Sequence, residues 1–585
     1  MIILGLNAFH ADSAAALVRD GILLAAAEEE RFRRIKHWAG FPIEALKFCL
    51  QQGGITLAEV DHVAINQDNR ANFLRKCIYA ASNRLNPKLL LERINVRRSR
   101  KGIPHLLEES LPGQKFRGTF HKIEHHVAHL SSAFHVSPFD DALVLSVDGF
   151  GDFSSAAWGL AHGSQIDVMS RVYFPHSLGI FYQAVTQHLG FPHYGDEYKV
   201  MGLAPYGRPK FLEQMRQIVR LTSDGSFELD LQFFRHHKER IAFQWSDGSP
   251  HFDDLFSSAL EALLGPRRAE ADPLEDHHRD LAHSAQLMYE EAFFHILANA
   301  HKVTGATNLA LAGGCAMNSV ANGKIRRVTP FKRVYVQSAA GDAGGAIGAA
   351  FAVWQMLSGR RTFIMDHAYW GPEFTEDDIS FALAEHRTSI ENAGCMVQKI
   401  ADTSDLCHRA ATAVSEGKVV GWFQGKMEWG PRALGNRSII CDPRRADMKA
   451  ILNDKIKKRE SFRPFAPSVL DRAVSEWFEE DDDVPFMMQV FQIRKEKRAQ
   501  IPAVTHVDGS GRLQTVHKNT NPRYYALIEQ FELLTGVPMV LNTSFNENEP
   551  LVCQPKEALD CFLRTNMDVL VLGNVMITRQ QVVPH

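Results

Sequence analysis

Histidine and aspartate residues in the first part of the chain have a spacing that suits a metal ion. His125 and His129 are four residues apart, so on a helix both imidazoles project from one face and can share an ion, whereas His126 points elsewhere. Asp148, at a strand end, and Asp342, in a glycine turn, are candidate third and fourth ligands. This set suits Fe(II), Mn(II) or Zn(II), and the spacing does not choose among them. An HxxxH pair alone is more often fortuitous than a site.

Four segments in the last third of the chain form a second constellation, at 430–438, 455–467, 512–515 and 541–546, and the first three contain arginine or lysine. Arginine and lysine stand there beside proline and aromatic residues. Guanidinium forks match phosphate geometry and lysine adds a point charge, so these segments predict an anion pocket. Surface salt bridges are the alternative for any single segment, and four such segments in one module make that alternative weaker.

Two glycine-rich turns suit a nucleotide. The apolar run 309–312 leads into Gly313 and Gly314 and then to Asn318, an order that predicts a strand, a turn and a helix start. Backbone amides at such a turn can hold an anion, although a tight turn that binds nothing is the alternative. A second glycine-rich helix start covers 341–350, where small residues allow close packing.

The elements expected around these residues begin with a strand at 2–7 and a hairpin formed by 14–18 and 22–27. A similar order recurs at 142–160, with an acidic glycine turn at 148–152. This repeated pattern is how actin-like ATPase folds hold nucleotide phosphates, although such hairpins are common. Further strands are expected at 419–423, 539–541 and 569–572. We place a linker at 359–371, between domains at 1–358 and 372–585.

Composition excludes several classes of protein. The chain has 585 residues, of which 45% are apolar and 23% charged, which is typical of a globular protein and excludes extensive disorder. The net charge of −3 argues against nucleic acid as the main partner. No signal peptide or membrane-spanning run is expected. Eight cysteines without a CxxC pair favour reduced thiols and a cytoplasmic location. The basic run at 93–101 is expected to be a solvated loop.

Longer motifs extend this pattern nearly from end to end. In the first part they are LGLNAFHADSAAAL, AEEERF, HHVAH, VDGFGD, SLGIFYQAVT, KVMGLAPYG, LAGGCAMN and GDAGGAIGAA. In the last part they are GWFQGKMEWGPRALGNRS, FRPFAPSV, NPRYY and LNTSFNENEPLV. With these motifs the chain resembles the NodU/CmcH-type O-carbamoyltransferase family, which includes the tobramycin carbamoyltransferase. GPRALGNRS followed by FRPFAP is the most specific part of the resemblance.

The resemblance implies an α/β protein with two domains. The N-terminal domain would be actin-like (ASKHA), similar to threonylcarbamoyl transferases, and the C-terminal domain would be YrdC-like. The implied enzyme is an ATP-dependent O-carbamoyltransferase that uses carbamoyl phosphate and Mg-ATP. The C-terminal domain would form carbamoyl adenylate and release pyrophosphate. The N-terminal domain would then transfer the carbamoyl group, with help from a metal, to a hydroxyl of a natural product or sugar-like small molecule.

The resemblance also implies roles for particular residues. His125, His129, Asp148 and Asp342 match the metal positions, with Fe(II) expected first and Mn or Zn as alternatives. His10 matches a histidine that assists acceptor deprotonation, and Gly313, Gly314 and Asn318 fall in a nucleotide motif. The contacts to carbamoyl phosphate and ATP would be made by Arg432, Lys457, Arg463, Arg512 and Ser544. His10, Lys457 and Arg463 are the expected catalytic residues. Lys457 is preferred over Lys455 and Lys458 because it lies six residues before Arg463.

Two other functions fit parts of the same pattern. One is a tRNA-modifying threonylcarbamoyl-type transferase, which the net charge of −3 disfavours. The other is a non-catalytic nucleotide-binding regulator, which the intact HHVAH motif and the arginine set disfavour. The acceptor cannot be read from the sequence, although the stretch 67–118 is expected to shape its access. A homodimer is one assembly that the sequence leaves open.

Overall fold

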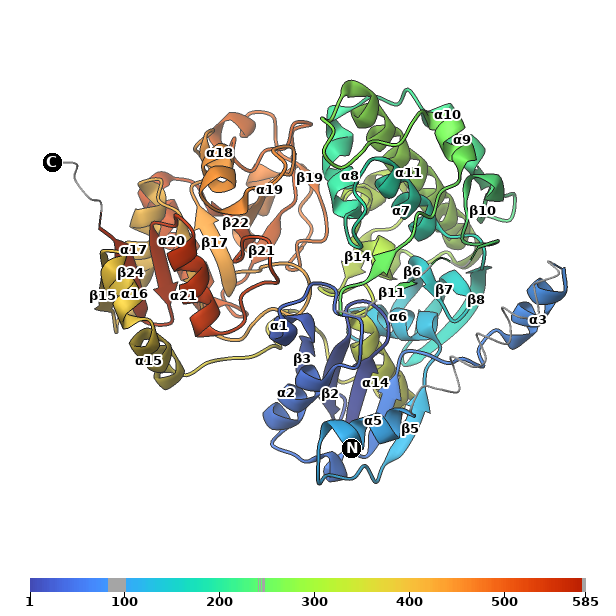
Figure 1. Ribbon diagram of the computed structural model, residues 1–585, viewed down its shortest axis with the longest axis horizontal. Coiled ribbons are helices and arrows are strands. Elements are labelled where there is room, and N and C mark those ends of the chain that lie inside the picture. Colours follow the sequence, from blue (N-terminus) through green and yellow to red (C-terminus); the bar gives the residue numbers. More distant parts are fainter. Residues whose placement is uncertain (83–101, 240, 242, 245–247, 581–585) are drawn as a thin grey trace.

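The computed structural model describes residues 1–82, 102–239, 241, 243–244 and 248–580. The basic run at 93–101 and part of the stretch 67–118 therefore lie outside the described residues. In Figure 1 the chain forms two modules side by side, one coloured mainly blue to green and the other coloured yellow to red. Among the described residues, none of the helices has the length and the apolar character needed to cross a membrane.

The first sheet of the N-terminal module has the order β3-β2-β1-β4-β5. Its strands are β1 (Ile2–Asn7), β2 (Ala14–Arg19), β3 (Ile22–Glu28), β4 (His62–Ile65) and β5 (Thr119–Lys122). β1 pairs antiparallel with β2, as β2 does with β3, whereas β1, β4 and β5 are parallel neighbours. The expected hairpin is therefore present, with its turn at Asp20-Gly21.

The second sheet repeats the arrangement of the first, with the order β14-β13-β6-β7-β8. Its strands are β6 (Asp141–Gly151), β7 (Ser154–His162), β8 (Gln165–Tyr173), β13 (Asn308–Ala312) and β14 (Arg333–Val336). β6, β7 and β8 are antiparallel neighbours, and β13 and β14 continue parallel to β6. Two copies of this five-stranded order give the N-terminal module its actin-like fold, as the sequence predicted.

Two helices pack closely between these sheets, α6 (His125–Phe134) and α14 (Gly344–Ser358). The small residues predicted to allow close packing do so here. A Cβ atom at Gly348 would lie 1.8 Å from the carbonyl oxygen of Ala128 in α6, and one at Gly5 would lie 1.9 Å from that of Ala346. A side chain at either glycine would force the helix away from its neighbours.

The other helices of this module flank the sheets and build its upper part in Figure 1, except for α3, which projects outward at the right. They are α1 (Glu30–Arg33), α2 (Ile43–Gly53), α3 (Phe73–Ser82), α5 (Ile103–Ser110), α7 (Leu178–His188), α8 (Glu197–Leu203), α9 (Leu212–Ile218), α10 (Ser258–Leu264), α11 (Asp276–Thr304), α12 (Ser319–Asn322) and α13 (Ile325–Val328). Short strands form three separate ribbons: β9 (Val219–Leu221) with β10 (Phe227–Leu229), β11 (Phe243–Gln244) with β12 (His251–Phe252), and, in the C-terminal module, β19 (Phe491–Gln492) with β20 (Ser510–Gly511).

The C-terminal module is built on a mixed eight-stranded sheet in the order β15-β24-β23-β16-β17-β22-β18-β21. Its strands are β15 (Cys395–Lys399), β16 (Val420–Phe423), β17 (Arg437–Cys441), β18 (Ala466–Leu470), β21 (Gln514–Val516), β22 (Met539–Ser544), β23 (Val569–Leu572) and β24 (Val575–Arg579). Its helices are α15 (Glu376–Glu385), α16 (Arg387–Asn392), α17 (Thr403–Ser415), α18 (Met448–Leu452), α19 (Val474–Trp477), α20 (Pro522–Thr535) and α21 (Pro555–Arg564). The three strands expected here are β16, β22 and β23.

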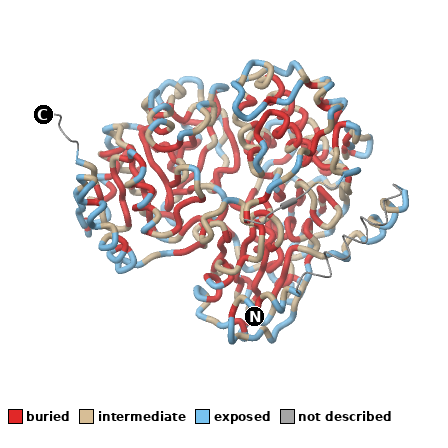
Figure 2. Tube along the Cα trace, viewed as in Figure 1, coloured by how far each residue is buried: buried red, intermediate tan, exposed pale blue. Residues whose placement is uncertain are grey.

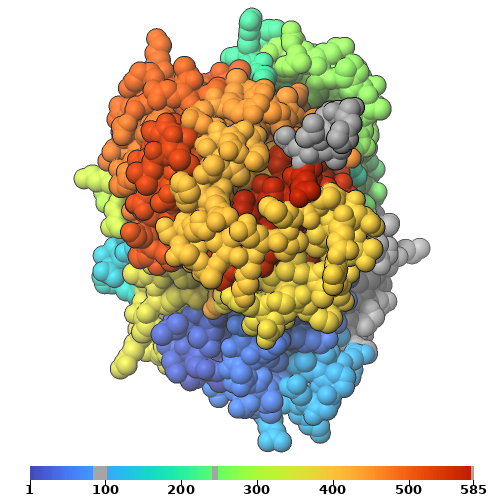
Figure 3. All heavy atoms as spheres, turned by 90° about the vertical axis from the view of Figure 1, so that its left-hand side faces the viewer, coloured from blue at the N-terminus to red at the C-terminus, as the bar shows by residue number. Residues whose placement is uncertain are grey.

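The two modules pack directly on each other. The core of the N-terminal module includes Trp429, Leu434 and Met487, which come from the C-terminal part of the chain. Figure 2 shows the buried residues concentrated in the sheets, and Figure 3 shows the yellow-to-red module lying on the blue N-terminal part. α14 ends at Ser358 and α15 begins at Glu376, so the expected linker runs between these helices. The precise boundaries and the YrdC likeness of the second module stay predictions.

Candidate functional site

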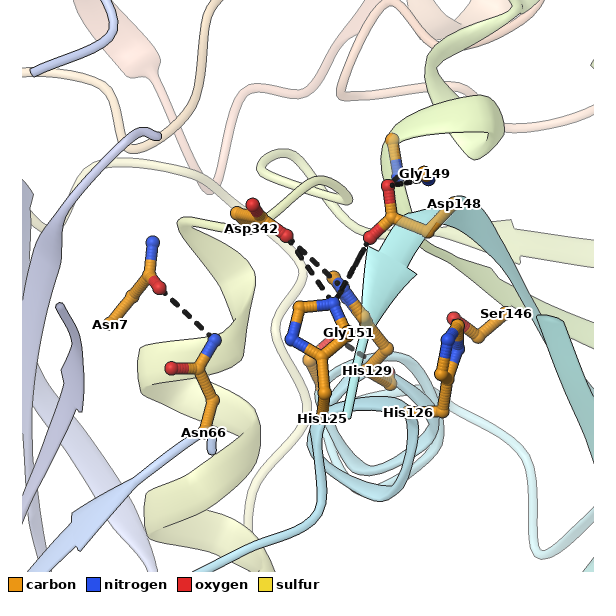
Figure 4. A network of polar contacts seen from close by, with 12 residues as sticks. Asn7, Asn66, His125, His126, His129, Ser146, Asp148, Gly149, Gly151 and Asp342 are labelled. Carbon is orange, nitrogen blue, oxygen red and sulfur yellow. Dashed lines mark hydrogen bonds and ion pairs between the residues drawn. The ribbon is translucent and has the colours of Figure 1, made fainter. Parts of the chain in front are cut away.

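The histidines of HHVAH form the first turns of α6, as their spacing predicted. The helix begins at His125, and the side chain of Glu124 caps it by accepting a hydrogen bond from the amide of Val127. The Nε2 atoms of His125 and His129 are 3.0 Å apart, and they lie 3.2 and 2.9 Å from Oδ2 of Asp148. Asp148 belongs to β6, so one helix and one strand bring these three side chains together (Figure 4).

Asp342 completes the cluster from the loop before α14. Its Oδ1 lies 3.6 Å from Nε2 of His125 and 3.4 Å from that of His129. This oxygen is buried and has no hydrogen-bond partner among the described residues. One ligand atom from each of the four residues lies within 4.8 Å of the others. Ligands about 2.1 Å from one ion are about 3.0 Å apart when they subtend a right angle, so the residues present fit a divalent metal.

The charges in this cluster favour a bound cation. Burial opposes a charge on His129, but its contacts to Asp148 and Asp342 outweigh burial and raise its pKa to about 9. Burial favours a neutral Asp148, but hydrogen bonds from the two imidazoles hold its pKa well below the usual range. A metal ion can take the place of the protons that these groups hold.

His126 points away from the cluster, as expected from its position on the helix. Its Nδ1 lies 2.9 Å from Oγ of Ser146, and Figure 4 shows this pair on the other side of α6. Burial and the neighbouring charge of His125 lower the pKa of His126 to about 4. It is therefore a neutral side chain of the core and not a fifth ligand.

His10 lies beside this cluster. Its ring centroid is 5.5 Å from that of His125. His10 lies in the turn between β1 and β2, whereas His125 begins α6. The turn that carries His10 is held by Asn7, whose amide donates to the carbonyl oxygens of Ala11 and Asp12. The position suits a base acting on a group bound near the metal ligands.

The predicted nucleotide turn lies at the same place. Gly313 has a φ of +89°, and a Cβ there would lie 2.2 Å from the carbonyl oxygen of Val147, so glycine is required for close strand packing. The amide of Gly314 donates to Oδ1 of Asp148 over 3.2 Å. Asn318 caps α12 and exchanges hydrogen bonds with Gln286. These contacts hold the turn in shape, and Gly314 and Asn318 also line the cavity described next.

A cavity of about 430 Å³ connects this cluster to the C-terminal module. On the N-terminal side its wall includes Asp12, Asp148, Glu197, Gly314 and Asp342. On the C-terminal side the wall includes Arg432, Lys457, Arg459, Arg463, Arg512 and Ser544. Residues predicted for two separate reactions therefore face one common space.

The sheet topology explains how four distant segments reach this cavity. β17 and β18 each run antiparallel to β22, and β21 runs parallel to β18. The starts of β17, β18 and β21 therefore meet the end of β22 at one edge of the sheet. Arg432, Arg463 and Arg512 each precede one of the three strand starts, and Ser544 ends β22.

Three arginines of this wall have no ion pair among the described residues, whereas the fourth, Arg463, lies 3.5 Å from Glu460. Nε of Arg432, Arg459 and Arg512 is buried without a hydrogen-bond partner among the described residues. Burial and, next, the charges of neighbouring arginines lower the pKa of Arg459 to about 9 and hold that of Arg512 well below its usual range. Burial lowers the pKa of Arg432 to about 10. Because buried unpaired donors are costly, a bound anion would stabilise this cluster, which the sequence analysis predicts to be an anion pocket.

Lys457 is the lysine that reaches the site. Its Nζ donates to the carbonyl oxygen of Ser544 over 2.6 Å, and to the carbonyl and side-chain oxygens of Asn546 over 2.7 Å each. Lys455 instead pairs with Asp568, and Lys458 lies 3.5 Å from Glu547. The structure thus places Lys457 in the cavity wall and gives its two neighbours other partners.

Sequence reasoning missed three cations of the cavity wall, one of which, Arg31, lies inside the AEEERF motif. Arg459 follows Lys457 by two residues in a segment already singled out, and Lys36 follows the AEEERF motif. Burial lowers the pKa of Lys36, and the charge of Arg463 is among the further contributions. A scan of the motif flanks for cations could have found Arg459 and Lys36, but their approach to the arginines is a tertiary contact.

Comparison with known families identifies the chain. Residues 2–351 match the family model described as carbamoyltransferase N-terminus, and residues 411–579 match the one described as carbamoyltransferase C-terminus. The chain belongs to the carbamoyltransferase family. The protein is therefore an enzyme of carbamoyl transfer, as its motifs predicted.

Several curated relatives cover nearly the whole chain. An uncharacterized protein of Synechocystis sp. is 41% identical, with 99% of this chain and 96% of the relative aligned. Nodulation protein NolNO of Sinorhizobium fredii is 38% identical, with 99% and 80% aligned. Nodulation protein U of Bradyrhizobium diazoefficiens is 29% identical, with 93% and 92% aligned. The similarity therefore covers both modules.

Proposed function

We propose that this carbamoyltransferase works in two steps at the two ends of its cavity, the first of which consumes ATP. Carbamoyl phosphate and ATP would give carbamoyl adenylate at the arginine wall, and the carbamoyl group would then pass to a hydroxyl of a small molecule beside the histidine cluster. The observation that carries the proposal is that one cavity is lined by buried guanidinium groups on one side and, on the other, by Asp148 and Asp342, two members of the cluster of metal-type ligands.

The activation step needs several negative groups held together. For the atoms to balance, water first splits carbamoyl phosphate into carbamate and phosphate. A carbamate oxygen then attacks the α-phosphorus of ATP, and pyrophosphate leaves. Arg432, Arg463 and Arg512 would hold the phosphate groups by paired hydrogen bonds. The ammonium of Lys457, on the Ser544 side of the wall, would add a point charge, and the four cations offset the repulsion between two polyanionic substrates.

The transfer step needs a polarised carbonyl and an activated hydroxyl. His125, His129, Asp148 and Asp342 would hold a divalent metal, expected to be Fe(II), which supplies Lewis-acid stabilisation of oxygen charge when it is bound. His10 would accept the proton of the acceptor hydroxyl, because an alcohol is a weak nucleophile at neutral pH. General-base help of this kind contributes about 10²–10⁴-fold. The carbamoyl–phosphate bond of the adenylate then breaks and AMP leaves.

An enclosed path between the two ends would protect the intermediate. Carbamoyl adenylate is a mixed anhydride that water can hydrolyse, so release into solvent would waste ATP. The common cavity supports direct passage of the intermediate between the two walls. The tRNA-modifying and regulatory alternatives lack a comparable observation in their favour.

Release of pyrophosphate in the presence of ATP, Mg²⁺ and carbamoyl phosphate tests the proposal. Wild type is compared with Arg463→Ala and with the double variant His125→Ala/His129→Ala. Release that depends on carbamoyl phosphate should be lost in Arg463→Ala and kept in the histidine variant. If metal-replete, folded wild type shows no dependence on carbamoyl phosphate, the proposed reaction is wrong.

A further inference from the structure

The segment after β3 reaches from the N-terminal module into the loop that carries Arg432. Nη2 of Arg31 donates to the carbonyl oxygen of Gly430 over 2.7 Å, and the amide of Gly430 donates to Oε1 of Glu28 over 3.0 Å. Both backbone groups of Gly430 are thus bound by side chains that lie about 400 residues earlier in the chain. Arg432 follows Gly430 by two residues, so this contact fixes the start of its loop.

Arg31 also lines the cavity, but it differs from Arg432, Arg459 and Arg512 because its charge is already compensated. Its Nε lies 3.0 Å from Oε2 of Glu28, and its Nη1 lies 2.8 Å from Oε1 of Glu30. Burial opposes its charge, but these two carboxylates raise its pKa above the ordinary value. A guanidinium paired in this way is a weak anion ligand and a firm support for the backbone that it binds.

Gly430 itself cannot easily adopt another arrangement. Its φ of +107° favours glycine, and an added Cβ would lie 2.4 Å from the carbonyl oxygen of Ser338 in the N-terminal module. The loop therefore passes close to that module in a conformation that few residues tolerate. Arg31 and Glu28 supply the hydrogen bonds that hold it there.

Arg34, at the end of α1, makes a similar contact to a second loop. Its Nη1 and Nη2 donate to the carbonyl oxygens of Leu551 and Pro550, each over 2.6 Å. Its Nη1 also lies 3.3 Å from Glu557. This loop follows Ser544 and Asn546, whose oxygen atoms receive the ammonium of Lys457. One short helix thus contacts both of the loops that frame the anion wall.

We infer that Arg31 and Arg34 are positioning residues of the anion site, which hold the loop of Arg432 and the loop after Ser544 in the geometry that binds carbamoyl phosphate. The C-terminal site is then completed by the N-terminal module. The inference rests on the proposed function for the identity of the anion, and the contacts that carry it are those of α1 with the two loops.

Binding and turnover of carbamoyl phosphate test this inference in the full-length protein. We would compare wild type with Arg31→Met, Arg31→Lys and Arg34→Met. Arg33→Met is the matched control, because Arg33 lies on the same helix and pairs with Glu29 inside the N-terminal module. Calorimetry gives the Kd for carbamoyl phosphate, and pyrophosphate release gives KM and kcat. Thermal unfolding and far-UV circular dichroism show whether each variant is folded.

Arg31→Met and Arg34→Met are expected to raise Kd and KM at least tenfold, with a smaller change in kcat. Arg31→Lys should recover part of the loss, and Arg33→Met should bind as wild type does. If folded Arg31→Met and Arg34→Met bind carbamoyl phosphate as tightly as Arg33→Met, the inference is wrong. If Arg31→Met does not fold, Arg34→Met decides the matter.

The same data separate this inference from the proposed function. A wild type that binds carbamoyl phosphate but releases no pyrophosphate would contradict the proposed reaction. Weaker binding by Arg34→Met in that case would still support the positioning role. Failure of wild type to bind carbamoyl phosphate would overturn both.

Discussion

The two walls of the cavity stabilise charge in opposite ways. At the histidine cluster, imidazoles and carboxylates face each other within 3.6 Å and partly satisfy one another. At the arginine wall, buried guanidinium groups lie near other guanidinium groups, and Nε of Arg432, Arg459 and Arg512 lacks a hydrogen-bond partner among the described residues. Bound protons can stabilise the histidine cluster when no metal is present. The arginine wall needs an anionic ligand to offset the repulsion between its guanidinium groups.

This difference explains why the two walls suit different parts of one reaction. A compensated cluster of neutral and negative ligands suits a small cation, and an uncompensated cluster of cations suits polyphosphates. In the proposed reaction, placing both on one cavity would let an anionic donor be activated at one wall and used at the other. The comparison predicts that changes at one wall leave the chemistry of the other largely intact.

The largest expected effect comes from Gly151→Ala, which should disrupt the histidine cluster and leave the arginine wall intact. An added Cβ would lie 2.0 Å from Cγ and Cδ2 of His125, so the imidazole must move. We expect loss of the bound metal and a fall of about 10³-fold in carbamoyl transfer, with pyrophosphate release retained. Metal content per chain, measured by mass spectrometry, checks this result.

Gly102→Ala is the control for that change, because its Cβ would approach Pro104 Cδ at an ordinary 3.9 Å. Full metal content in folded Gly151→Ala would contradict the assigned ligand geometry. Loss of pyrophosphate release together with the metal would show that the two walls are not independent.

A change at the arginine wall should have the next largest effect. Lys457→Met removes the ammonium that binds Ser544 and Asn546. We expect pyrophosphate release to fall by about 10²-fold, because one preorganised charged donor is lost. Lys458→Met is the matched control, since Lys458 lies near Glu547 on the exposed side. Steady-state rates for both variants, with equal metal content, make the comparison, and equal losses would contradict the assignment of Lys457.

The smallest effect concerns the stability of the protein in acid. A buried imidazole gains a proton as the pH is lowered, whereas the guanidinium groups are already charged. Burial lowers the pKa of His135 to about 3, and its ring lies 2.7 Å from Oγ of Ser131. A histidine in the unfolded chain has a pKa of about 6.5. Between pH 6.5 and 3 the unfolded chain therefore binds more protons at this position than the folded one, and the free energy of unfolding decreases as the pH is lowered. Because of this histidine, the free energy of unfolding should be about 2 kcal/mol lower at pH 5 than at pH 8.

His135→Gln cannot take up this proton, so its free energy of unfolding should fall by about 2 kcal/mol less than that of wild type between pH 8 and 5. Urea unfolding at the two pH values measures the difference. An equal fall in both proteins would show that His135 does not contribute to acid sensitivity.

The sequence predicted much of the fold and of each wall because the signals are local. Alternation of apolar runs and turns predicted β1 to β3, and the four-residue spacing of His125 and His129 required only that 125–134 be a helix. The arginine motifs predicted an anion pocket because the charge and the hydrogen-bonding geometry of a side chain are known from its residue type. The match to the N-terminal and C-terminal models of the carbamoyltransferase family agrees with the same motifs.

Other features depend on the tertiary structure. The approach of Arg459 and Lys36 to the arginine wall, and the choice of Lys457 over its neighbours, follow from how loops meet at one edge of the eight-stranded sheet. The role of the stretch 67–118 stays a prediction, because part of it lies outside the described residues. Acceptor identity likewise depends on a surface that no motif encodes.

The sequence by itself determined the chemistry at each wall, because residue type and short spacing fix what a side chain can bind. Only the tertiary structure decided that the two walls share one cavity and that Arg31 supports Gly430 across 399 positions of the chain. Contacts of this range depend on strand order and on the packing of two modules, and no local pattern in the sequence carries that information.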